Sequence, residues 1–169
     1  MKCLQLQLVY LGLVIFFIGP MVLCIYRTQL EKKCAKFRFQ IISYRSATKC
    51  LKWNNSSETY ANAVSFCEDI DTGTLLANFK TDDELALADR YSRQWQFWVG
   101  LTDLQREGVY RWTDDGSYAR DLDQIFKAQE MTNLLNPVDC VAYMVPFSTH
   151  VARHCFAKLP SFCEVKSAM

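Results

Sequence analysis

The sequence lacks the short motifs that carry most enzymatic and nucleotide chemistry. It contains no glycine-rich phosphate loop, no Gly-x-Ser-x-Gly turn and no His-Glu-x-x-His zinc motif. It also lacks low-complexity segments and repeats, so it is typical neither of a disordered tail nor of a solenoid. We therefore expect a folded protein that is not an enzyme.

The chain also lacks a net excess of one charge. Beyond residue 24 its basic and acidic residues cancel, and we expect no nucleic-acid partner. The distribution is uneven, because residues 25–52 hold eight Lys or Arg against one acid, whereas residues 53–169 hold ten against seventeen. The basic neck, residues 25–33, is interpreted either as a solvated segment or as a site for sulfated polysaccharide or anionic lipid.

One long uncharged run is present, at residues 8–26. Its length suits either a secretory signal peptide or a membrane span. Gly19-Pro20 and the small side chains before Ile25 favour cleavage after Cys24, and the basic flank that follows disfavours export behind an uncleaved anchor. Residues 1–24 are thus predicted to be a signal peptide of a secreted protein or, alternatively, the signal anchor of a type II membrane protein.

Six cysteines follow this leader, an even number that predicts three disulfides in an oxidising compartment. Spacing alone leaves 15 pairings open. Asn54 and Asn55 each begin a glycosylation sequon, and we expect both as acceptors on a surface loop. The six cysteines are Cys34, Cys50, Cys67, Cys140, Cys155 and Cys163.

Hydrophobic periodicity predicts two helices followed by several short strands, an α+β order. The first helix, 58–70, follows a cap at Ser57 and a turn at 54–57, and the second, 81–93, begins with Thr81 as its N-cap. A long loop without periodicity covers residues 117–138. Strands are predicted at 36–46, 50–53, 74–79, 95–103, 109–113, 139–146, 153–158 and 161–165.

Several of these segments, in this order, resemble a C-type lectin-like domain over residues 34–165, with 166–169 as a tail. The family places a Trp-Ile-Gly-Leu strand where this chain has "FWVGLTD", with Val99 in place of the usual Ile. The resemblance implies a fold with two helices, short antiparallel sheets and a long ligand-binding loop. The other matching segments are "GTLLANF", "DDEL", "RWTDDGS", "DCV" and "CFAKLPSFCE".

The resemblance also implies the disulfide pairing. Cys67 would pair with Cys163, Cys140 with Cys155, and Cys34 with Cys50 as the extra N-terminal bridge of the long form of the family.

Sugar-binding members of the family hold Ca²⁺ through a Glu-Pro-Asn or Gln-Pro-Asp triplet in the long loop. In this chain Pro137 is flanked by Asn136 and Val138, so the triplet lacks one oxygen-bearing side chain. Where the family has Trp-Asn-Asp before the late cysteine, this chain has His150, Val151 and Ala152. We therefore predict no sugar-coordinating metal site and no required cofactor. A weak Ca²⁺ elsewhere in the loop would use Asp121, Asp123, Glu130 and Asp139.

The long loop is the expected ligand-binding element. Its apolar side chains, Ile125 and Phe126 with Met131, Leu134 and Leu135, either face a protein ligand or pack onto the body. The favoured hypothesis is an extracellular recognition module that binds a glycan or a cell-surface or extracellular protein without Ca²⁺. The alternative is a Ca²⁺-dependent lectin with an atypical site. The candidate ligand residues are Ile125, Phe126, Glu130, Asn133, Asn136 and Asp139.

Two further patterns have competing interpretations. His150 and His154 have the i, i+4 spacing of a zinc pair, but we interpret them as surface histidines because Cys155 is needed for a disulfide. Trp98 is expected in the core, with Phe97 facing the other way, and the exposure of Trp95 is left open.

Overall fold

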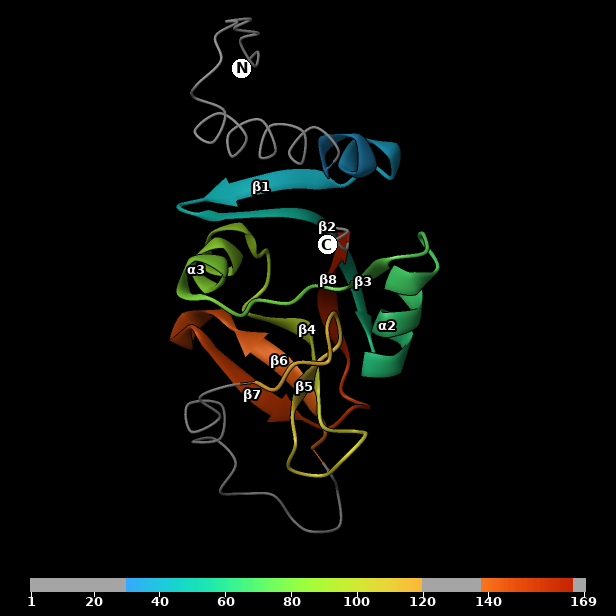
Figure 1. Cartoon of the computed structure of the whole chain (residues 1–169). Helices are drawn as coiled ribbons and strands as arrows, with labels where there is room; N and C mark the ends of the chain where they lie inside the picture. The colour runs from blue at the N-terminus through green and yellow to red at the C-terminus, as the bar shows by residue number, and fades with distance from the viewer. Residues whose placement is uncertain (1–29, 120–137, 166–169) are drawn as a thin grey trace, which may run out of the picture.

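The chain forms an eight-stranded sheet flanked by helices α2 and α3, as seen in a computed structural model that describes residues 30–119 and 138–165 (Figure 1). The predicted α+β class is confirmed, with a further helical segment at residues 30–36. The elements are β1 (Gln40–Tyr44), β2 (Ala47–Glu58), α2 (Tyr60–Glu68), β3 (Thr74–Leu76), α3 (Asp82–Tyr91), β4 (Gln96–Thr102), β5 (Arg111–Trp112), β6 (Cys140–Met144), the 3-10 turn η1 (Val145–Phe147), β7 (Thr149–Arg153) and β8 (Leu159–Val165).

The strand order is β1-β2-β8-β4-β6-β7, with β3 paired to β8 and β5 paired to β4. All of these pairs are antiparallel except β4 with β8. The last strand therefore sits in the middle of the sheet, between the first half of the chain and the second. This placement brings the ends of β4 and β6 together at the edge of the sheet that carries the candidate site.

The core has two clusters, one on each side of the sheet. Phe97 belongs to the cluster that includes Leu87 and Ala88 of α3, and the next residue, Trp98, belongs to the cluster of Ala63 on α2. Successive side chains of a strand point to opposite faces, which explains the division. The prediction that Trp98 is core and that Phe97 faces the other way is thus confirmed. Trp95, left open, is 58% exposed.

Both helices begin at a threonine. Thr81 accepts a hydrogen bond from the Glu84 amide at 3.3 Å, and Glu84 reaches back to the Thr81 amide, forming a capping box. The predicted N-cap Thr81 is confirmed. The cap of α2 is Thr59, whose hydroxyl accepts from the Asn62 amide at 3.4 Å, so the prediction of Ser57 was wrong.

Three strand predictions were also wrong. Residues 54–57 continue β2 instead of turning, because Asn54 pairs with Ser161 of β8 before the register shifts. The first strand begins at Gln40, since the segment from Lys36 to Phe39 ends the helical stretch and turns. The strand predicted at 153–158 is instead β7, which pairs with β6 and ends at Arg153.

Three disulfides connect these elements, in the pairs that the family resemblance implies. Cys67–Cys163 joins α2 to β8, Cys140–Cys155 joins β6 to the segment after β7, and Cys34–Cys50 joins helix 30–36 to β2. Within the described ranges, no helix is long and apolar enough to cross a membrane. The predicted signal peptide or anchor, residues 1–24, lies outside those ranges.

Candidate functional site

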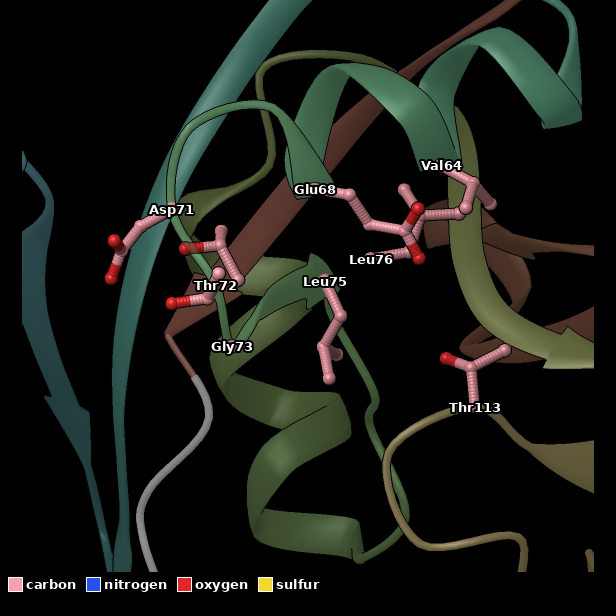
Figure 2. A pocket seen from close by; sticks show the side chains of 9 residues that line it. Val64, Glu68, Asp71, Thr72, Gly73, Leu75, Leu76 and Thr113 are labelled. Atoms are coloured by element: carbon pink, nitrogen blue, oxygen red, sulfur yellow. The ribbon is translucent and has the colours of Figure 1, made fainter.

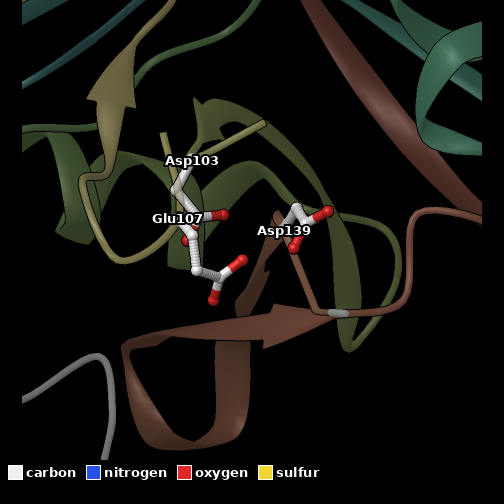
Figure 3. Close-up of side chains that lie close together, drawn as sticks. All are labelled: Asp103, Glu107 and Asp139. Carbon is white, nitrogen blue, oxygen red and sulfur yellow. The ribbon is translucent and has the colours of Figure 1, made fainter. Parts of the chain in front are cut away.

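Three carboxylates converge at the ends of β4 and β6. Oxygen atoms of Asp103, Glu107 and Asp139 lie within 4.8 Å of one another (Figure 3). Asp103 directly follows β4 and Asp139 directly precedes β6, and the two strands are antiparallel neighbours. The Asp103 amide donates to the Asp139 carbonyl at 3.1 Å, which holds the two segments together. We call these three residues the acid triad.

The β4–β5 loop brings Glu107 back to Asp103 through a tight turn. The Arg106 amide donates to the Asp103 carbonyl at 2.8 Å, and the Gly108 amide donates to Asp103 Oδ2 at 2.8 Å. Gly108 has a φ of 74°, a conformation that glycine adopts without strain. The sequence therefore positions two acids four residues apart on one loop.

The acid triad gathers three carboxylates, and none of them forms an ion pair with a cationic side chain among the described residues. Asp103 is only 3% exposed, and burial, together with the nearby Asp139 carboxylate, raises its pKa, whereas the Gly108 amide acts in the opposite direction. Oδ1 of Asp103 and Oδ1 of Asp139 are buried and have no hydrogen-bond partner among the described residues. Buried carboxylate oxygens without donors are costly unless a cation neutralises them.

The donor set fits a hard divalent cation. Ca²⁺ takes six to eight oxygen ligands at flexible geometry, many of them carboxylates. Asp103, Glu107 and Asp139 would hold such an ion, and its charge would offset their mutual repulsion. The chemistry that Ca²⁺ supplies when bound is electrostatic support of the β4–β5 loop next to β6.

Of the four acids predicted to hold a weak Ca²⁺, the structure describes only one. Asp139 lies in the acid triad, whereas Asp121, Asp123 and Glu130 lie outside the described residues. Sequence reasoning missed Asp103 and Glu107. A signal for them was present in the sequence. Asp103 ends a predicted strand, Glu107 follows four residues later next to a glycine, and Asp139 begins a later predicted strand.

The other candidate ligand residues of the long loop also fall outside the described ranges. They are Ile125, Phe126, Glu130, Asn133 and Asn136. Only Asp139 of that set is described, and it is half-buried.

The strand that would complete a sugar-bridging site has no side-chain oxygen at the critical positions. Val151 and Ala152 lie on β7, paired with Ala142 and Val141 of β6. Val151 is buried. These positions therefore contribute apolar packing to the sheet and no ligand to a metal.

The prediction that both histidines are surface residues was wrong for His150. Its side chain is 8% exposed and lies between the rings of Trp112 and Tyr143, at centroid distances of 5.5 and 5.4 Å. Burial lowers its pKa to about 4. His154 is exposed, as predicted. The two therefore do not form a zinc pair.

A groove of about 460 Å³ lies beside α2 and β3. Figure 2 shows Val64 and Glu68 of α2 on one wall, Leu75 of β3 below them and Thr113 on the far rim. The lining is aliphatic, with hydroxyl groups and the carboxylates of Glu68 and Asp71. It offers neither a nucleophile–base pair nor a cationic side chain.

The two predicted glycan acceptors occupy different environments on β2. Asn54 is 6% exposed, and its Oδ1 accepts a hydrogen bond from the Ser56 amide at 3.1 Å. Asn55 is exposed and accepts from Trp53 Nε1 at 3.3 Å. Both belong to a strand, so their predicted placement on a surface loop was wrong.

Comparison with known proteins identifies the same domain. A family model described as the lectin C-type domain matches residues 56–165. Among curated proteins, the chain is similar to C-type lectin domain family 4 member E of Mus musculus, with 23% identity over 139 residues, covering 79% of this chain and 61% of that protein. It is also similar to the CD209 antigen of Papio hamadryas, with 27% identity over 97 residues, covering 56% of this chain and 26% of that protein. The chain thus spans less than two thirds of the length of these relatives.

Solved structures give the same result at the level of the fold. The human scavenger receptor C-type lectin carbohydrate-recognition domain aligns with a TM-score of 0.60 and 22% identity, covering 72% of this chain and 94% of that one. The C-type lectin CEL-I from Cucumaria echinata aligns with a TM-score of 0.61 and 21% identity, covering 73% and 94%. At these identities the likeness concerns the fold alone.

Proposed function

Because the chain belongs to the C-type lectin domain family, we propose that it is an extracellular recognition module that binds a glycan or a protein without a bridging Ca²⁺. Its ligand surface would be formed by the long segment 120–137 together with Asp139, whose carboxylate belongs to the acid triad. The module is secreted or tethered through residues 1–24. It works by binding, and we expect no catalysis.

The observation that carries this proposal is the chemistry of β7. A metal that bridges to sugar hydroxyls needs several protein oxygens and must retain open positions. Val151 and Ala152 supply none, and Pro137 is followed by Val138, so two or more ligands are absent from the places where sugar-binding members of the family have them. Direct contacts from side chains of residues 120–139 would then supply the affinity.

The acid triad favours a second role for Ca²⁺ within this proposal. Asp103 and Asp139 have buried unpartnered oxygens, and Glu107 adds a third carboxylate. An ion there would hold the β4–β5 loop against the start of β6. The same triad is the specific observation behind the second candidate function, a Ca²⁺-dependent lectin with an atypical site.

A binding screen separates the two functions. The full chain, displayed on cells, is offered to a glycan array and to a library of cell-surface proteins, in millimolar Ca²⁺ and in excess chelator. We expect binding that survives chelation and that persists in Asp103→Asn, a variant that removes one triad carboxylate. Ligand binding that is abolished both by chelator and by Asp103→Asn would establish the Ca²⁺-dependent alternative instead.

A double variant in the segment 120–137 tests whether that segment contacts the ligand. Ile125→Ser and Phe126→Ser, combined, should weaken binding of the identified ligand, because the proposed surface loses two apolar side chains. The matched control is Phe156→Ser, which removes an aromatic side chain that is 87% exposed. Equal losses in the two variants would place the ligand surface elsewhere.

A further inference from the structure

A second groove, of about 310 Å³, lies between the C-terminal end of α3 and the ribbon formed by β1 and β2. In Figure 1 this region lies well away from the β4–β5 loop that carries the acid triad. Its floor is apolar and aromatic. Trp53 of β2 is register partner to Phe162 of β8, and their ring centroids are 4.5 Å apart, with Leu51 beside them.

The rim of this groove carries positive charge only. Arg90 and Arg93 line it, and no carboxylate does. Within residues 30–119 and 138–165, neither arginine has an ion-pair partner within 4.0 Å. The Arg90 guanidinium lies 5.4 Å from the centre of the Tyr44 ring, a contact that positions it without neutralising it.

Three of the four acids of α3 are engaged by other residues, and the fourth, Asp82, lies in the first turn, at the opposite end of the helix from Arg90. Asp83 bonds to Ser46, Glu84 pairs with Lys49 at 3.0 Å, and the Asp89 carboxylate accepts from the Tyr143 hydroxyl at 2.7 Å. The two arginines at the end of the helix therefore keep their charge available.

We infer that this groove binds an acidic saccharide, with its sulfate or carboxylate on Arg90 and Arg93 and a sugar ring against the aromatic side chains. Guanidinium groups form paired, charge-assisted hydrogen bonds with such oxyanions. The half-buried Trp53 and the exposed Tyr91 line the groove and supply aromatic rings against which a sugar can pack, and Gln40 offers an amide for its hydroxyls. The volume is at the lower end of the range for small-ligand sites, about 300 Å³ upwards, which suits a sugar better than a peptide loop.

This site is independent of the ligand surface proposed above, and calorimetry tests it separately. The purified full chain is titrated with a heparin-derived tetrasaccharide, with the same sugar after desulfation and N-acetylation, and with an oligoglutamate peptide of matched charge. The sulfated sugar should bind. The desulfated sugar retains its uronate carboxylates, so its residual affinity separates carboxylate from sulfate recognition.

Three variants locate the binding. Arg90→Gln combined with Arg93→Gln should weaken tetrasaccharide binding by about tenfold or more, the effect of losing charge-assisted hydrogen bonds. Tyr91→Ala, which changes no charge, should weaken it by a smaller factor. The control, Arg106→Gln combined with Lys158→Gln, removes two exposed charges elsewhere and should leave binding unchanged. Melting temperatures of all variants verify that they fold.

The inference fails on any of three results. An absence of tetrasaccharide binding, or equal losses in the Arg90/Arg93 and Arg106/Lys158 variants, would show that no built site exists there. Tighter binding of oligoglutamate than of the sugar would assign the groove to an acidic peptide. None of these results would affect binding through residues 120–139.

Discussion

Lys49 of β2 and Glu164 of β8 form a buried ion pair, with Lys49 Nζ 2.8 Å from Glu164 Oε1. The same ammonium group lies 3.0 Å from Glu84 Oε1 of α3. The Lys49 side chain therefore links strands β2 and β8 to helix α3. Burial alone would lower the pKa of Lys49, but the two carboxylates outweigh it and raise that pKa. Burial raises the pKa of Glu164, and Lys49 offsets part of that rise.

Removing this cation should destabilise the fold strongly. Lys49→Met leaves Glu164 buried without its partner, and breaking one side of a buried pair costs about 3–5 kcal/mol. Denaturant unfolding with disulfides intact measures the loss, with Lys158→Met as the exposed control, expected to change stability by no more than about 0.5 kcal/mol.

The pH dependence of the Lys49→Met variant provides a second measurement. Without Lys49 the folded-state pKa of Glu164 rises further above its unfolded value, so the folded state takes up a proton more readily than the unfolded chain. The variant should therefore regain stability as pH falls from 7 towards 5. A loss that is the same at both pH values would mean that the charge left on Glu164 is not the cause.

The disulfides should differ in their contribution to stability. Cys67–Cys163 closes a separation of 96 residues and Cys34–Cys50 one of 16. The chain-entropy estimate assigns about 5 kcal/mol to the longer loop and about 3 kcal/mol to the shorter. Paired Cys→Ala variants, unfolded in denaturant, should follow that order.

Alkylation mass spectrometry of the non-reduced protein should find no free thiol among the six cysteines, and labelling of any of them would contradict the pairing.

His150 should make the fold sensitive to mild acid. Its folded pKa of about 4 lies below the ordinary value of about 6.5, so the unfolded chain binds the proton first as pH falls. The stability that neutral His150 provides is complete above pH 6.5 and is lost as pH falls towards 4. The loss between pH 7 and pH 5 is about 2 kcal/mol. His150→Phe should remove this component from the unfolding free energy, whereas His154→Gln should retain it. Parallel pH profiles for wild type and His150→Phe would refute the assignment.

Glycosylation, where it occurs, should favour Asn55 over Asn54. The Asn54 side chain is buried and engaged with Ser56, whereas Asn55 is exposed on the same strand. Site-occupancy mass spectrometry of protein expressed in eukaryotic cells measures the two separately. Asn55→Gln should abolish most of the glycan although the Asn54 sequon remains, and Asn54→Gln should leave it in place. Equal occupancy in the two single variants would contradict this expectation.

Calcium should stabilise the domain only modestly. Three carboxylates form an incomplete ligand set, which suits the weak extracellular range of about 10⁻⁴–10⁻³ M. At a tenfold excess over that dissociation constant the gain is about 1.4 kcal/mol. Thermal melting with Ca²⁺ and with chelator measures it. Asp103→Asn should abolish the rise in melting temperature, and Asp71→Asn, in the groove beside α2, should retain it. A rise that persists in Asp103→Asn would place the ion elsewhere.

Local sequence was sufficient for the features that depend on neighbouring residues. The N-cap at Thr81 needs only a threonine ahead of an acidic first turn, and the alternation of Phe97 and Trp98 follows from the geometry of any strand. An even set of six cysteines predicts a disulfide-bonded domain whatever its fold, and the structure has the three bridges. The order of several short motifs was enough to identify the family.

Features that depend on partners distant in the chain were decided only by the tertiary structure. Residues 54–57 read as a turn, yet pairing of Asn54 with Ser161 keeps them in β2. His150 reads as a surface residue, yet Trp112 and Tyr143 from two other strands enclose it. The acid triad exists because β4 and β6 are antiparallel neighbours, which brings Asp139 to Asp103 across the sheet. Periodicity reports which face of an element is buried, but the identity of the neighbour across that face depends on the strand order.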